Sequence, residues 1–229
     1  MKKIGMIVAV FREIEAVLNK YEGSLEKLDY KAFDVYKFTD EKSELYILHS
    51  GMGQIAAASG AQFLISTFGV DLIINYGVVG GLTEEMTLSK TCIVESVVHY
   101  DFDTSLIDNC EVGRYCNLPS LYLPATAELI ELATSVHPEL KRVVCASGDK
   151  FVENRKRKEE LNKDFNADIC EMEAAGIVLT SNRNDVPCIL IKTVSDSITG
   201  GAEEFSREVR RAAVICLEIV NKIIEKIII

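Results

Sequence analysis

The sequence lacks a surplus of basic side chains. Its 25 lysine and arginine residues are outnumbered by 35 aspartate and glutamate residues, which gives a formal net charge of −10. Nucleic acids and acidic membrane surfaces are bound by clusters of basic groups that neutralise phosphates. The composition therefore argues against a nucleic-acid partner and a membrane partner, and the negative charge is typical of a soluble protein.

Cysteines with the paired spacing of a metal site are also absent. The seven cysteines are odd in number and scattered, at positions 92, 110, 116, 145, 170, 188 and 216. Disulfide frameworks of secreted domains usually contain an even number of cysteines. We therefore expect reduced, mostly buried thiols, a cytoplasmic protein and no bound metal.

The chain has no uninterrupted apolar run long enough for a membrane span. Near the N-terminus two lysines precede the run "IGMIVAV", but Phe11, Arg12 and Glu13 end it without a signal-peptide cleavage site. Charged residues interrupt the apolar C-terminal stretch from Cys216 onwards. These patterns predict a buried first strand and an amphipathic terminal helix.

Signatures of common nucleotide cofactors are missing as well. Neither "SGMGQ" (50–54) nor "GVVGG" (77–81) contains GxGxxG at a helix start, or glycine followed by lysine and a hydroxyl residue. Both stretches are equally compatible with tight turns in which glycine adopts a positive φ. We expect no redox cofactor, no bound triphosphate and no other organic cofactor.

What the sequence does contain is an alternation of strand-like and helical segments. Apolar β-branched runs occupy residues 3–10, 44–50, 71–79, 91–99, 141–147 and 186–196. Helical patterns occupy residues 11–20, 54–68, 125–135, 153–162, 173–184 and the stretch from about 203. This alternation predicts one three-layer α/β/α domain over residues 1–229. Residues 31–50 are typical of a hairpin, so we expect a mixed central sheet.

Polar residues gather where the predicted strands end, and ligands of open α/β sheets bind at that edge. The positions are Glu13, 50–54, 77–81, 147–151, 171–176 and 195–197. Taken singly, Asp196 also fits a helix N-cap, and Glu13 a solvated first turn. Glu173 enters a crowded environment beside Met172, and a buried carboxylate needs a partner, such as the two adjacent hydroxyls of a ribose. We expect one crevice to collect these residues.

Six motifs occur in order over nearly the whole chain: "IGMIVAVFREIEAVL", "SGMGQIAAA", "DLIINYGVVGGL", "SGDKFV", "EMEAAGI" and "PCILIKTVSD". The most specific are "SGDKFV" and "EMEAAG" followed by "VSD". In these motifs the chain resembles the 5′-methylthioadenosine/S-adenosylhomocysteine nucleosidases of the nucleoside phosphorylase family. The resemblance implies a nucleoside phosphorylase-like fold and a hydrolase that converts 5′-modified adenosines to adenine and a free thioribose.

The resemblance also implies a role for individual residues. Glu13 would activate the attacking water, Asp196 would protonate N7 of the leaving purine, and Glu173 would hold the ribose 2′- and 3′-hydroxyls. The implied binding residues are Phe151 stacked on the base, Val152 pairing with the base edge through its backbone, Met172 against the sugar, Ser195 hydrogen-bonded to Asp196, Met52 and Val10 near the ribose and 5′ substituent, and Phe205 at the outer wall. These roles suit the chemistry, because N-glycosidic cleavage passes through a cationic sugar that needs negative groups nearby.

Two residues depart from the family pattern. Val78 replaces a serine and Lys192 replaces an arginine, both near the attacking water or, in phosphorylases, the phosphate. Because lysine cannot reproduce the bidentate geometry of arginine and Glu13 would repel phosphate, hydrolysis is favoured over phosphorolysis. Two alternatives stay open: a nucleosidase or phosphorylase for another purine nucleoside, and a low-activity nucleoside-binding protein.

Residues 99–124 differ most from the family. In the family this region carries a loop that closes the 5′ end of the neighbouring subunit's pocket, with Tyr115, Leu118 and Pro119 as the counterparts here. The resemblance therefore implies a homodimer in which residues 99–124 lie near the neighbour's pocket. His99 and Asp101 have the residue types of a catalytic pair, but we expect His99 to be structural, because a histidine at a strand end readily satisfies backbone groups.

Overall fold

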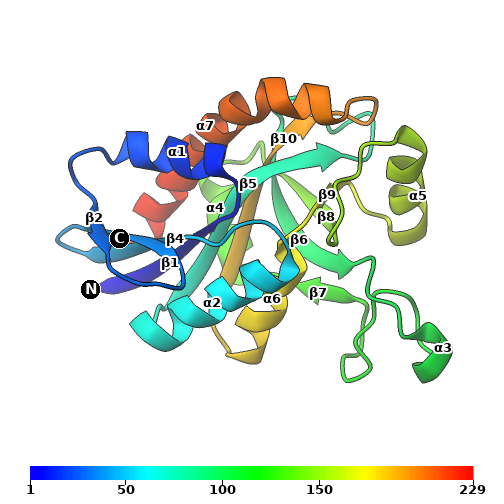
Figure 1. The fold of residues 1–229 in the computed structure, drawn as a ribbon, viewed down its shortest axis with the longest axis horizontal. Helices are drawn as coiled ribbons and strands as arrows, with labels where there is room; N and C mark the ends of the chain where they lie inside the picture. Colours follow the sequence, from blue (N-terminus) through cyan, green and yellow to red (C-terminus); the bar gives the residue numbers. More distant parts are fainter. Residues whose placement is uncertain (229) are drawn as a thin grey trace.

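The computed structural model describes residues 1–228, which form a central sheet with helices on both faces (Figure 1). The strands are β1 (Lys2–Val8), β2 (Glu26–Leu28), β3 (Asp34–Thr39), β4 (Ser43–His49), β5 (Leu72–Gly81), β6 (Thr91–His99), β7 (Tyr122–Pro124), β8 (Lys141–Ser147), β9 (Ile169–Glu171) and β10 (Cys188–Asp196). The helices are α1 (Phe11–Lys20), α2 (Gln54–Phe68), α3 (Ser105–Asp108), α4 (Ala127–Val136), α5 (Arg155–Phe165), α6 (Ala174–Arg183) and α7 (Ala202–Ile227).

The strands form one mixed sheet in the order β10-β6-β8-β9-β5-β1-β4-β3-β2, with β7 paired to β6. Strand β5 also pairs with β10, so that β5, β9, β8, β6 and β10 close into a ring. Every residue of β5 and β10 is buried, as expected for strands covered on both faces. The predicted hairpin is present, because β3 and β4 pair antiparallel.

Parallel pairing sets the position of the ligand site. Strand β1 lies parallel to both β4 and β5, and β5 lies parallel to β10. The carboxyl ends of these strands therefore meet at one edge of the sheet. This is the edge at which open α/β sheets bind ligands.

Helices cover the sheet in two layers, which confirms the predicted α/β/α class. Helices α1 and α7 pack together on one face, and α2 and α6 pack together on the other (Figure 1). Helix α7 is amphipathic, as predicted, and its buried residues are Val209, Ala212, Ala213, Cys216, Leu217, Val220, Ile223 and Ile224. No helix within residues 1–228 combines the length and apolarity needed to span a bilayer.

Short elements account for most differences between prediction and structure. Strands β2, β7 and β9 contain three residues each and α3 contains four, so none has a period long enough to detect. The tight-turn interpretation of residues 77–81 is wrong, because these residues continue β5. It is correct for the loop before α2, where Gly51 and Gly53 have φ values of +79° and +99°.

Candidate functional site

A pocket lies at the carboxyl ends of β1, β5 and β10 and has a volume of about 560 Å³, its open mouth included. All predicted site residues except Val152 line it: Val10, Glu13, Met52, Val78, Phe151, Met172, Glu173, Lys192, Ser195, Asp196 and Phe205. Val152 lines an adjoining recess that also contains Phe151 and Asp196. The structure thus brings the predicted residues together in one crevice.

Glu13 lies in the first turn of α1 with its carboxylate buried, so the solvated interpretation is wrong. Its Oε2 accepts the backbone N–H of Val10 at 2.9 Å, and its Oε1 accepts that of Val78 at 2.7 Å. Burial raises the pKa of Glu13, whereas these backbone donors and the Lys192 ammonium oppose the rise. The carboxylate is therefore held at a fixed position on the pocket wall.

Two glycines of β5 make room for acidic side chains. A Cβ on Gly77 would lie 2.6 Å from Glu13 Oε1, and a Cβ on Gly80 would lie 3.0 Å from Asp196 Oδ2. Any larger residue at either position would have to displace a carboxylate. Close approach of the acids, rather than turn geometry, thus explains these two glycines of "GVVGG".

Asp196 is the last residue of β10 and is buried, so the helix N-cap interpretation is wrong. Ser195 Oγ donates to its Oδ1 at 3.1 Å, which is the contact that the resemblance implies. Lys158 Nζ donates to its Oδ2 at 2.6 Å. Burial raises the pKa of Asp196, and the hydrogen bonds from Lys158 and Ser195 oppose the rise.

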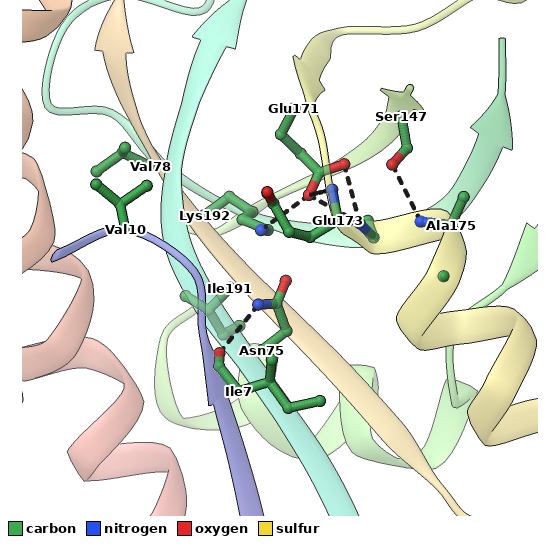
Figure 2. Close-up of polar contacts among 12 residues, drawn as sticks. Ile7, Val10, Asn75, Val78, Ser147, Glu171, Glu173, Ala175, Ile191 and Lys192 are labelled. Carbon is green, nitrogen blue, oxygen red and sulfur yellow. Dashed lines mark hydrogen bonds and ion pairs between the residues drawn. The ribbon is translucent and has the colours of Figure 1, made fainter. Parts of the chain in front are cut away.

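The two glutamates of "EMEAAG" have different partners. Glu171 accepts the backbone N–H groups of Glu173 and Ala174 at 2.9 to 3.0 Å, and Lys192 Nζ donates to its Oε2 at 3.2 Å (Figure 2). Glu173 Oε1 accepts the backbone N–H of Gly53 at 2.9 Å. Glu171 is therefore tied into the start of α6, whereas Glu173 is held by a single backbone donor from the loop before α2.

Lys192 is buried among carboxylates. Burial alone would lower the pKa of Lys192, but Glu171 and Glu173 hold that pKa above its usual value. Burial and the charge of Glu171 raise the pKa of Glu173 to about 8, against the opposing effect of Lys192. The raised pKa therefore favours the protonated form of Glu173 in the free protein.

A polar network joins the starts of α2 and α6. Gln54 Nε2 donates to Ser147 Oγ at 2.7 Å, and Gln54 Oε1 accepts the Gly176 N–H at 2.7 Å. Ser147 Oγ also accepts the Ala175 N–H at 3.0 Å (Figure 2), and Asp149 Oδ1 accepts the Gln54 N–H at 2.7 Å. These hydrogen bonds fix the loops after β4 and β8, both of which contribute to the pocket.

His99 and Asp101 do not line the pocket. His99 Nδ1 lies 2.7 Å from the Tyr115 hydroxyl, and His99 Nε2 lies 3.1 Å from Asp101 Oδ1. Phe102 stacks on Tyr115 with 4.3 Å between ring centroids. These contacts hold the base of the projecting segment that carries α3 (Figure 1). They fit the structural role predicted for His99, but the partners of its ring are side chains rather than the backbone groups expected.

The cysteines are free thiols throughout residues 1–228, and most of them are buried. Cys170 lines the pocket, and burial raises the pKa of its thiol to about 12. In the same part of the chain, no group of three or more histidine, cysteine, aspartate or glutamate side chains is placed to hold a metal ion.

Asn75, Tyr76 and Lys158 are among the residues of the site that were not predicted. Asn75 and Tyr76 line the pocket from β5; Asn75 Nδ2 donates to a β1 carbonyl at 3.1 Å (Figure 2), and the Tyr76 hydroxyl donates to the Glu13 carbonyl. A polar residue inside an otherwise apolar strand was the available signal for Asn75. Lys158 belongs to the charged start of α5, and its spacing from the buried Leu161 is the only local sign of burial.

Three comparisons relate the chain to known proteins. The phosphorylase superfamily model matches residues 3–228. The chain is 33% identical to 5′-methylthioadenosine/S-adenosylhomocysteine nucleosidase of Halalkalibacterium halodurans, over 89% of this chain and 88% of that protein. It is 27% identical to aminodeoxyfutalosine nucleosidase of Helicobacter pylori, over 86% of each. A structure of the Neisseria meningitidis 5′-methylthioadenosine/S-adenosylhomocysteine nucleosidase with methylthio-immucillin-A has a TM-score of 0.90 at 26% identity, covering 98% of this chain and 99% of that chain.

Replacing Glu173 or Glu171 by glutamine should change the free energy of unfolding in opposite directions. The pKa of Glu173 is about 8 in the folded protein, against an ordinary 4.5. The contribution of Glu173 to the free energy of unfolding is therefore complete below pH 4.5 and is lost as pH rises through 8. Glu173→Gln should remove this decline and raise the free energy of unfolding near pH 8 by on the order of 1–3 kcal/mol relative to wild type.

Glu171→Gln is the matched comparison. It removes the charged partner of buried Lys192, so it should lower the free energy of unfolding by about 3 kcal/mol at both pH values. Urea denaturation near pH 5.5 and near pH 8 measures both effects. An unchanged pH slope in Glu173→Gln, or a harmless Glu171→Gln, would contradict the charge arrangement described above.

Proposed function

The chain belongs to the phosphorylase superfamily, and on that premise we propose that it is a purine nucleosidase that hydrolyses 5′-modified adenosines to adenine and the free 5′-modified ribose. The observation that carries the proposal is the presence of three separately held, buried carboxylates, Glu13, Glu173 and Asp196, in one pocket. A nucleosidase needs a base for water, an anionic partner for the ribose and an acid for the departing purine. Each carboxylate can supply one of these roles.

Asp196 is the proposed acid. Its buried carboxyl holds a proton more readily than an exposed aspartate and would transfer that proton to N7 as the bond between C1′ and N9 breaks. Ser195 on Oδ1 fixes the orientation of the carboxyl. The half-exposed ring of Phe151 would stack on the purine, and the Val152 backbone in the adjoining recess would pair with the base edge.

Glu13 is the proposed base. Two backbone N–H groups hold its carboxylate, so that it can orient a water molecule toward C1′ and take its proton. Burial raises its pKa, which makes the carboxylate a better proton acceptor than an exposed glutamate. The same negative charge stabilises the cationic sugar as it forms.

Glu173 is the proposed partner of the ribose hydroxyls. Hydrogen bonds donated by the 2′- and 3′-hydroxyls favour the ionised carboxylate, and its charge then strengthens the contact as the sugar becomes cationic. Met172 would pack against the sugar. The remaining proposed contacts, to the ribose and its 5′ substituent, come from Val10, Met52 and Phe205.

The surroundings of Val78 and Lys192 favour water over phosphate as the acceptor. The Val78 N–H already donates to Glu13, and the Lys192 ammonium donates to Glu171. Phosphate needs several free donors, and Glu13 would repel it. These contacts support hydrolysis rather than phosphorolysis.

The proposal covers more than one 5′ substituent. The relatives include nucleosidases named for methylthioadenosine and S-adenosylhomocysteine and others named for aminodeoxyfutalosine, all of them 5′-modified nucleosides. Met52, at the pocket, is exposed. Closure of that end by a second copy of the chain fits the homodimer implied by the family resemblance, with residues 99–124 near the neighbour's pocket.

The reaction is tested by incubating the protein with 5′-methylthioadenosine, with and without inorganic phosphate, and quantifying adenine and sugar products. Adenine should appear at the same rate in both, with free methylthioribose as the only sugar. A predominant sugar 1-phosphate would instead establish a phosphorylase, and binding without adenine release a nucleoside-binding protein. S-adenosylhomocysteine, aminodeoxyfutalosine and inosine, assayed in parallel, rank the substrates by kcat/KM.

Glu13→Gln and Glu15→Gln form a matched pair on α1. The first should lower turnover by roughly 10²- to 10⁴-fold, because it removes the proposed base. The second changes a side chain that forms surface ion pairs with Arg12 and Arg210, so turnover should stay near wild type. Equal losses in both variants would remove Glu13 from its role.

The homodimer makes a separate prediction. Leu106 and Ile107 on α3 are fully or largely exposed, which is unfavourable for two adjacent large apolar side chains in an isolated chain. We expect light scattering to give the mass of two chains. A mass of one chain at working concentration would contradict the proposed dimer without affecting the proposed reaction.

A further inference from the structure

Lys158 is a fully buried lysine whose ammonium group is saturated by hydrogen bonds. Its Nζ donates to Asp196 Oδ2 at 2.6 Å, to the Ser197 carbonyl at 2.7 Å and to the Gly200 carbonyl at 3.1 Å. An ammonium has three N–H donors, so each has a partner. The side chain therefore has one fixed position, directly against the proposed acid.

The position of Lys158 is unusual for its helix. Other cations of α5 form pairs at the surface, such as Arg155 with Glu159 and Arg157 with Glu160. Burying an ammonium is strongly unfavourable unless it is paired and hydrogen-bonded, and apolar replacements of buried ion pairs are often as stable. Packing alone thus gives no reason for a lysine here, which points to a use for its charge at Asp196.

We propose that Lys158 is a positioning residue for Asp196, one that orients the carboxyl and stabilises the carboxylate left behind when its proton moves to the purine. The proposal rests on the proposed nucleosidase function. In the step concerned, the Asp196 proton bonds to N7 and the electrons of the C1′–N9 bond pass to the purine. The water oxygen bonds to C1′, and Glu13 takes one proton from that water. Glu13 then releases this proton to solvent, and solvent returns a proton to Asp196.

The charged and titratable groups around Asp196 come from three elements. Lys158 of α5 favours the ionised carboxylate, whereas Glu204 near the start of α7 disfavours it. Cys170 of β9 also faces Asp196, but its thiol stays neutral at working pH because burial raises its pKa to about 12. Lys158 is therefore the group whose removal should most increase the proton affinity of Asp196.

The expected signature of Lys158→Met is a changed pH profile of kcat/KM for adenine release. Because Asp196 must be protonated to react, activity falls as pH rises through its pKa. Loss of the ammonium should move this alkaline limb upward by about 1 pH unit or more. The plateau should fall about tenfold or more, since a weaker, less oriented acid transfers its proton more slowly.

Lys156→Met is the control on the same helix. Its side chain is exposed and its ammonium lies 3.9 Å from Glu160, so both the plateau and the alkaline limb should match wild type. Thermal unfolding of both variants establishes that they are folded at the assay temperature.

A double-mutant cycle with Asp196→Asn separates the positioning role from general damage. Asp196→Asn alone should lower turnover by roughly 10²- to 10⁴-fold. If Lys158 acts through Asp196, adding Lys158→Met to that variant should change turnover by less than about twofold. Additive losses, or a lowered plateau with an unmoved alkaline limb, would overturn the proposal and leave Lys158 as a structural clamp on residues 197–200. Failure of the wild-type protein to release adenine would instead reject the proposed function.

Discussion

Three carboxylates and one ammonium buried against each other are the constraint on which the site depends. Glu13, Glu171 and Glu173 all act on Lys192, and together they carry more negative than positive charge when ionised. Buried charges are tolerated only with partners, and each acid is stabilised in a different way. Glu171 accepts hydrogen bonds from the Lys192 ammonium and from the start of α6, and Glu13 accepts hydrogen bonds from backbone N–H groups. Glu173 has a raised pKa, which favours its protonated form. A ribose that donates two hydroxyl hydrogen bonds would complete the set.

The fold supplies these partners because of where its strands end. The parallel strands β1, β5 and β10 finish at one edge, where the residue before α1, strand β5, the loop before α2 and the start of α6 present N–H groups. Ring closure between β5 and β10 brings Asp196 against Gly80, on the strand that also carries Gly77 beside Glu13. The acids are thus placed by strand pairing, and the glycines leave room for their side chains.

Local patterns predicted the elements and the crevice, since buried parallel strands read as continuous apolar runs and polar motifs follow them. The family resemblance read from the same motifs is confirmed by the superfamily match over residues 3–228. Features that depend on long-range contact could not be read this way. The pairing of β5 with β10 leaves no local signal, and Lys158 sits in "RKRKEE", which is typical of a solvated helix start. Its burial and its contacts with Asp196, Ser197 and Gly200 distinguish it from its neighbours.

The protonated state of Glu173 in the free protein is tested most directly by counting protons released when a ligand binds. Calorimetric titration near pH 7, in buffers of different ionisation enthalpy, gives this count for an adenosine C-nucleoside, which has no cleavable glycosidic bond. An Asp196→Asn background prevents Asp196 from contributing to the count. Because ribose hydroxyls favour ionised Glu173, release should approach about one proton. It should be smaller for the 2′-deoxy analogue and absent when Glu173→Gln is added. Binding without proton release, or equal release after Glu173→Gln, would contradict the account.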